Sequence, residues 1–70
     1  MRNENVRAEI VNQFRQARKD RGIPQQDLAD MTGTKKSNIS RFESGRYNPS
    51  LDFLIKLATG LGIEMHFSIQ

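Results

Sequence analysis

The chain has 70 residues, no cysteine and a formal net charge of +3. A chain of this length forms one small domain that buries only about 60% of its unfolded surface, so its stability as a monomer is marginal. Without cysteine, neither a disulfide nor a thiolate metal site can reinforce the fold, which leaves oligomerisation as a common route. We expect a cytoplasmic protein, because the sequence contains no signal-peptide core and no segment able to span a bilayer.

The positive charge is concentrated in one window, from Gly33 to Ser50. The other seven cations and seven anions of the chain cancel. A basic patch on one element is typical of proteins that bind a polyanion. A solvated helix face is the alternative explanation. The charges of the window are those of Lys35, Lys36, Arg41 and Arg46 against Glu43.

The first helix is predicted over about residues 5–21, with Asn3 or Asn5 as its N-cap. Gly22 suits the position that ends this helix, and Pro24 can open the next one. The apolar stripe of the helix consists of Val6, Ile10, Phe14 and Ala17, with Arg18 at its edge.

Two short helices follow, over about residues 25–32 and 36–44, and they are hinged at Gly33. A helix pair joined by so short a turn is a helix-turn-helix, whose second helix is expected in the major groove of DNA. The apolar positions that would hold the pair against the core are Leu28, Ala29, Ile39 and Phe42.

The predicted DNA contacts follow from the chemistry of the side chains. Lysine and arginine can donate to guanine, while serine and asparagine offer shorter contacts. Gln25 stands in the first turn of its helix, where a phosphate is favoured, although a solvated glutamine is the alternative. Arg46 and Tyr47 can reach the DNA backbone beside the groove, but Tyr47 can equally be a packing residue. The residues predicted to lie on the groove-facing helix or at its start are Lys35, Lys36, Ser37, Asn38 and Arg41.

Glu43 needs a nearby cation, because a carboxylate in the last turn of a helix opposes the helix dipole. Arg18 is the candidate partner, and two unrelated surface charges are the alternative.

A fourth helix is predicted to begin after Ser50, which is a good N-cap, and to end at Gly62. From Ile63 onward apolar and polar residues alternate, which predicts a strand with one apolar face over residues 63–70. A lone strand seeks a partner, and the simplest is the same strand of a second copy; a frayed or helical tail is the alternative. The apolar face of the helix is Leu51, Leu54, Ile55, Leu57, Ala58 and Leu61, and that of the strand is Ile63, Met65, Phe67 and Ile69.

Several motifs in combination resemble the helix-turn-helix domain of phage repressors and Cro proteins, also called the XRE-like family. The resemblance covers about residues 14–62. It is carried by Gln25-Gln26-Asp27-Leu28-Ala29, Thr32-Gly33, Asn38-Ile39-Ser40-Arg41-Phe42-Glu43-Ser44-Gly45 and Asn48-Pro49-Ser50-Leu51.

The resemblance implies a compact helix bundle that binds operator DNA as a dimer. Gln25 would contact phosphate, three residues of the second helix would face base edges, and Asn38 would lie beside the backbone. Arg18 and Glu43 match an internal ion pair of the family. The C-terminal strand is similar to the tail that helps join two subunits in antitoxin-type members. The residues facing base edges would be Lys36, Ser37 and Arg41.

Three positions depart from the pattern of the family. Lys35 replaces the usual serine or threonine N-cap, a loss of about 1 kcal/mol unless Thr34 substitutes for it. Thr34 itself replaces an aliphatic residue. Gly60 replaces alanine, at a cost of up to about 1 kcal/mol inside a helix.

We therefore expect an all-α fold, a four-helix helix-turn-helix domain over residues 1–62, with a C-terminal strand over residues 63–70 that pairs across a homodimer. The expected function is that of a transcriptional regulator, a repressor of a palindromic operator, without a cofactor. The alternative is an antitoxin that neutralises a toxin protein and represses its own operon. Catalysis is not expected, because a single histidine, His66, and no cysteine cannot assemble a triad or a metal site.

Overall fold

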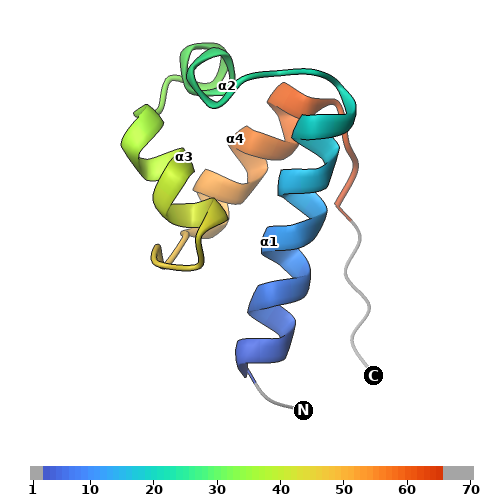
Figure 1. Cartoon of the computed structure of the whole chain (residues 1–70), viewed down its shortest axis with the longest axis vertical. Helices are drawn as coiled ribbons and strands as arrows, with labels where there is room; N and C mark the ends of the chain where they lie inside the picture. Colours follow the sequence, from blue (N-terminus) through green and yellow to red (C-terminus); the bar gives the residue numbers. More distant parts are fainter. Residues whose placement is uncertain (1–2, 66–70) are drawn as a thin grey trace.

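The computed structural model describes residues 3–65 and contains four helices in that range (Figure 1). The first and longest is α1 (Asn3–Asp20), and α2 (Gln25–Thr32) crosses over the end of the bundle. The helix α3 (Lys36–Glu43) lies on the outside, and α4 (Leu51–Leu61) runs behind it toward α1. The described residues contain no strand, so the predicted all-α helix-turn-helix domain is confirmed.

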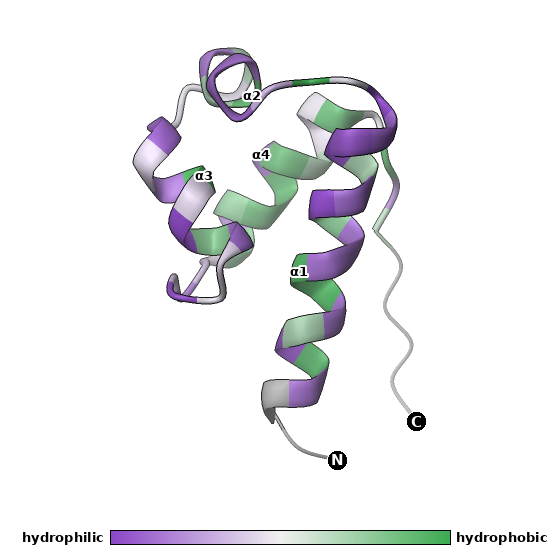
Figure 2. Cartoon of the chain, viewed as in Figure 1, coloured by the Kyte–Doolittle hydropathy of each residue, from purple (hydrophilic) through white to green (hydrophobic). Residues whose placement is uncertain are grey.

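All four helices contribute to one core. Figure 2 shows that α4 is mostly hydrophobic whereas α3 is largely hydrophilic, as expected for an inner and an outer helix. Ile39 and Ala29 are fully buried, and both lie in the helix-turn-helix. The buried residues of the core are Val11, Phe14, Leu28, Ala29, Ile39, Phe42, Phe53, Leu57, Ala58 and Leu61.

The predicted start of α1 is wrong. The helix already includes Asn3 and Asn5, so neither residue is its N-cap. Phe14 is buried as predicted, and Val11 is buried beside it, because the contact with α3 and α4 shifts the inner face of the helix by one residue. Ile10 packs only partly against the core.

Part of the predicted apolar face of α4 is also wrong. Leu51 is 60% exposed and Ile55 is 47% exposed, whereas Phe53, which the pattern did not single out, is buried. The helix packs against α1 and α2, and Leu51 and Ile55 lie one turn apart, outside this packed side. The sequence alone could not show that Leu51 and Ile55 lie outside the core. With Phe53 included, the apolar residues of α4 are compatible with two different inner faces.

The C-terminal residues 63–65 belong to neither a helix nor a strand. Ile63 and Met65 are half-buried and pack against the core of their own chain, between α1 and α4. Phe67 and Ile69, the other two apolar residues of the predicted strand, lie outside the described residues. The pairing of this segment between two copies therefore stays a prediction.

Within residues 3–65, none of the helices combines the length and the apolarity that crossing a membrane requires.

Candidate nucleic-acid interface

The outward face of α3 is polar and exposed. Ile39 and Phe42, fully buried beneath it, fix the rotation of the helix about its axis. Phe42 makes edge-on ring contacts with Phe14 of α1 and Phe53 of α4, at centroid distances of 5.8 and 5.5 Å. Such contacts hold α3 rigidly against two neighbouring helices. The exposed residues of the helix and its C-cap are Lys36, Ser37, Ser40, Arg41 and Ser44.

Two of these exposed residues, Ser40 and Ser44, are not among the DNA contacts predicted from the sequence. Both follow Ser37 at helical spacing, so extending the helical period from the predicted contacts identifies them. The Ser44 hydroxyl donates to the carbonyl oxygen of Arg41 at 3.0 Å. This hydrogen bond holds the Ser44 side chain against the last turn of the helix.

The turn between α2 and α3 sets their relative orientation. Gly33 has φ of 69°, in the left-handed region that favours glycine, and caps α2 by donating to the carbonyl oxygen of Ala29. The chain then enters α3 at Lys35, which makes no side-chain cap. Thr34 does not substitute, because its hydroxyl bonds to that of Thr32 at 3.1 Å. The predicted loss of a cap on α3 is therefore confirmed.

Arg18 and Glu43 form the predicted ion pair. The guanidinium Nε and Nη2 of Arg18 donate to the two carboxylate oxygens of Glu43 at 2.6 and 2.8 Å. Its Nη1 donates to the carbonyl oxygen of Ile23 at 2.8 Å. The side chains are only 11% and 8% exposed, so the pair is well shielded from water. It ties the end of α3 to the end of α1.

Burial raises the pKa of the Glu43 carboxyl, but other effects outweigh it. Hydrogen bonds from Arg18 and Gln25, with the charges of Arg18 and Arg15, leave the pKa of Glu43 below its ordinary value. The carboxylate is therefore ionised at neutral pH and accepts three hydrogen bonds.

Gln25, a predicted phosphate contact, takes part in this network. Its side-chain amide donates to Glu43 at 3.1 Å, so the alternative of a solvated glutamine is wrong. An amide nitrogen carries two hydrogens, and a phosphate can use the second. Gln25 lies beside α3, at the edge that carries Ser40 and Ser44.

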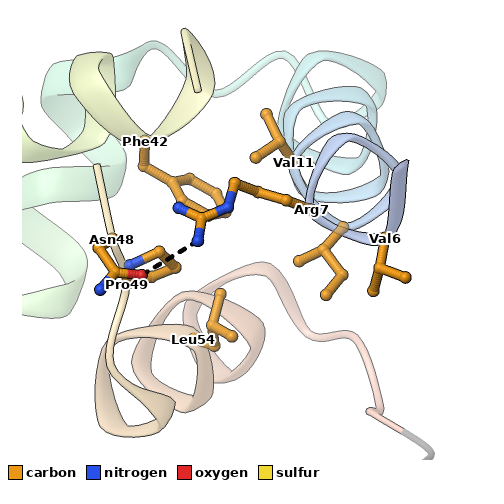
Figure 3. A pocket seen from close by; sticks show the side chains of 8 residues that line it. Val6, Arg7, Val11, Phe42, Asn48, Pro49 and Leu54 are labelled. Atoms are coloured by element: carbon orange, nitrogen blue, oxygen red, sulfur yellow. Dashed lines mark hydrogen bonds between the residues drawn. The ribbon is translucent and has the colours of Figure 1, made fainter. Parts of the chain in front are cut away.

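The loop after α3 brings the other predicted contacts beside the helix. Arg46 is exposed. Tyr47 is half-buried, with its ring 4.9 Å from that of Phe53, so it does serve as a packing residue. Asn48 accepts a hydrogen bond of 3.4 Å from Arg7 of α1 (Figure 3). The loop is thus tied to α1 on one side and to α4 on the other.

The Arg7–Asn48 contact spans an apolar crevice of about 290 Å³ between α1 and α4. Phe42, Val11 and Leu54 point into it from three helices (Figure 3). None of the residues on the outward face of α3 lines this crevice, so it is separate from the polar surface.

Among the hollows that border the outward face of α3, two contain predicted DNA contacts. The first, of about 550 Å³, lies between α3 and α4 and is named here the α4-side hollow. The second, of about 320 Å³, lies between α3 and the end of α1 and is named the α1-side hollow. Of the predicted contacts, the α1-side hollow receives Gln25, while Lys36 and Arg46 line neither. The α4-side hollow brings together Lys35, Ser37, Asn38, Arg41 and Tyr47.

Comparisons with known proteins agree with this architecture. A family model described as Helix-turn-helix matches residues 14–67. A solved structure of the restriction-modification controller protein C.AhdI from Aeromonas hydrophila superimposes with a TM-score of 0.80 at 33% identity, covering 86% of this chain and 91% of the controller.

Curated relatives carry similar names. An uncharacterised HTH-type transcriptional regulator from Methanothermobacter thermautotrophicus is 40% identical over 51 residues, 73% of this chain and 74% of the relative. Another, from Haemophilus influenzae, is 36% identical over 62 residues, or 89% of this chain. The chain spans 63% of the length of the Haemophilus relative.

The fold and the polar face of α3 define a helix-turn-helix protein, the class that the motifs indicated. The chain belongs to the helix-turn-helix family, since the family model matches more than half of its length.

Proposed function

We propose that the protein is a sequence-specific transcriptional regulator that binds double-stranded DNA as a homodimer, with α3 in the major groove. The observation that carries the proposal is the exposed outward face of α3, on which Lys36, Ser37 and Arg41 stand above a fully buried inner side. Lysine, serine and arginine are side chains that read base edges. The names of the curated relatives support the same class of function.

The similarity to the controller protein from Aeromonas supports the same class of function, because that protein is described as a restriction-modification controller and 91% of its length is matched. By this similarity we place the regulator in the cytoplasm and assign it the role of a repressor.

The proposed homodimer rests on the alternating sequence of the C-terminal residues and on two exposed apolar side chains of α4. Residues 63–70 alternate between apolar and polar, which suits a strand paired antiparallel with the same strand of a second copy. The exposed pair Leu51 and Ile55 on α4 provides a further apolar contact for the partner. A two-fold axis would present two copies of α3 to the half-sites of a palindromic operator.

The alternative function is an antitoxin that binds a toxin protein directly. None of the relatives reported above is named as an antitoxin. Purification of the tagged protein from its native host, with identification of any stoichiometric ribonuclease or kinase, separates the two functions.

Selection of bound sequences from random duplex DNA tests the main proposal. We expect a two-fold symmetric site whose half-sites are about 10 base pairs, one turn of DNA, apart. Failure to enrich any sequence would contradict the proposal.

Two substitutions then separate base contacts from phosphate contacts. Arg41→Ala should cost roughly 1–3 kcal/mol on the selected site and relax the preference at one base pair. Arg46→Ala should weaken binding to all sequences and reduce the salt slope by about one unit. The measurement is affinity on the selected and on scrambled duplexes across a salt series. If both variants weakened all DNA equally, this division of roles would be wrong.

A further inference from the structure

Cations outside the helix-turn-helix border the proposed DNA-binding face. What we infer from them below rests on the function proposed above. In the α1-side hollow, Arg15 and Lys19 stand one turn apart on α1. Both are exposed. With Arg18, they place three cations in a hollow that contains one carboxylate, that of Glu43.

The α4-side hollow has a similar charge. Lys56 of α4 is exposed and lies across the hollow from Lys35 and Arg41. These three cations face one carboxylate, that of Asp52. Each hollow is therefore net positive, although the cations come from different helices.

The hollows lie on opposite edges of α3. Successive residues of an α-helix are rotated by about 100°, so Ser37 and Arg41 share one side of the outward face. Ser40 and Glu43 fall on the other side. The first two line the α4-side hollow and the second two line the α1-side hollow. The outward face of α3 is thus a ridge between two positively charged depressions.

Arg15, Lys19 and Lys56 are exposed, and none of their side chains makes a hydrogen bond or an ion pair with another residue of the described range 3–65. In the α1-side hollow, the ion pair joins Arg18 to Glu43. Arg15 lies close enough to lower the pKa of Glu43, but it makes no contact with the carboxylate. Exposed charges that make no structural contact are available to a ligand.

The geometry of DNA identifies that ligand. The major groove is about 12 Å wide and an α-helix with its side chains is about 10–12 Å across, so a helix in the groove fills it. The two sugar-phosphate backbones then pass along its two edges. Cations at those edges meet phosphates, which fix the position of the protein without reading sequence.

We propose that Arg15 and Lys19 bind phosphates of one DNA strand and that Lys56, across the helix, binds phosphates of the other. The phosphate contacts of α1 and α4 thereby hold α3 in the groove. These contacts determine the depth and tilt of α3, whereas α3 itself selects the sequence.

The test pairs charge removal on the protein with charge removal on single phosphates. Arg15→Gln, Lys19→Gln and Lys56→Gln are measured on the selected duplex and on duplexes that carry one neutral methylphosphonate each. Arg21→Gln is the charge control, because Arg21 is an exposed cation directly after α1 that lines neither hollow. Arg21 also donates to the carbonyl oxygen of Ala17, so the stability of this variant is compared with that of the others. Thermal unfolding of each variant confirms that it is folded.

Each of the three variants should lose roughly three- to tenfold in affinity and about 0.9 in salt slope, with unchanged base preference. The penalty of a methylphosphonate should disappear in the variant that lacks the facing cation. The methylphosphonate positions that lose their penalty in the Arg15 and Lys19 variants should lie on one DNA strand. Those that lose it in the Lys56 variant should lie on the opposite strand.

Three results would overturn the inference: losses no larger than that of Arg21→Gln, coupling of all three cations to one strand, or altered base preference. A wild-type protein that binds no DNA would instead overturn the function on which the inference rests.

Discussion

Lys35 occupies a position where stability and binding make opposite demands. A serine or threonine there would accept a hydrogen bond from the first turn of α3, but lysine makes no such bond. The same lysine adds a positive charge to the α4-side hollow. A residue that weakens the fold can persist at a functional surface when it strengthens binding.

Lys35→Thr should therefore stabilise the domain by about 1 kcal/mol and weaken DNA binding. The new hydroxyl would cap α3, while one cation would leave the hollow. Urea unfolding and affinity measured on the same preparation test both effects. An unchanged midpoint would show that the first N–H groups of α3 are satisfied in another way.

The ion pair of Arg18 and Glu43 makes the stability of the domain dependent on acid. The pKa of Glu43 is lower in the folded chain than its ordinary value of 4.5. Unfolding therefore takes up a proton in the acid range. The stabilisation is complete above pH 4.5 and is lost as the pH falls through the lowered pKa of the folded state.

Glu43→Gln should remove this acid dependence and should lower stability at neutral pH, because Arg18 would remain shielded without a charged partner. The free energy of unfolding measured between pH 3 and pH 7 tests this. Asp30→Asn, at an exposed carboxylate of α2, serves as a control. Parallel curves for wild type and Glu43→Gln would contradict the assignment.

At the scale of elements, α2 and α4 meet closely at Gly60. A Cβ atom built on Gly60 would lie 2.7 Å from the methyl group of Thr32 and 3.5 Å from Leu28. Thr32 cannot easily turn away, because its hydroxyl is held by the carbonyl oxygen of Leu28 at 2.6 Å. The sequence suggested only that Gly60 lowers helix propensity. The structure shows in addition that the close contact between α2 and α4 requires a residue without a Cβ atom at this position.

Gly60→Ala should destabilise the wild-type domain by about 1–2 kcal/mol through overpacking. In a Thr32→Ser background, which keeps the hydroxyl and removes the methyl group, the same change should become neutral or stabilising by up to about 1 kcal/mol. A double-mutant cycle by thermal unfolding measures the coupling. Additive effects would show that the helices separate at little cost.

At the scale of the whole molecule, the domain is small and exposes apolar side chains, which favours association. The described residues 3–65 leave Leu51 and Ile55 largely exposed on α4. Ile63 and Met65 pack on their own core and belong to no strand, so these two residues of the predicted strand are partly covered within one copy. The proposed dimer would place the rest of that strand against a second copy.

Phe67→Asp should convert the proposed dimer into a monomer, because one charge would be buried at each copy of the proposed strand. Sedimentation at several concentrations measures the mass. Ile55→Asp, at an exposed apolar residue of α4, is the comparison. A Phe67→Asp protein that keeps the mass of the dimer would remove the strand from the interface, and a monomeric Ile55→Asp protein would place α4 in it.

Much of the fold and of the site could be predicted from local patterns. The bounds of α2, the turn at Gly33 and the burial of Ile39 and Phe42 follow from spacing, since each depends on residues close in sequence. The Arg18–Glu43 pair was one of two alternatives until the family resemblance favoured it, because its partners are 25 positions apart.

The sequence by itself determined the helix-turn-helix, its family and the polar side chains of α3, because helical periodicity and short motifs are local properties. Only the tertiary structure decided which cations outside the motif border α3 and why Gly60 is glycine. It also decided which apolar residues of α4 remain exposed. These features depend on how separate helices pack, and a hydrophobic pattern shows that a face is apolar without showing which neighbour covers it.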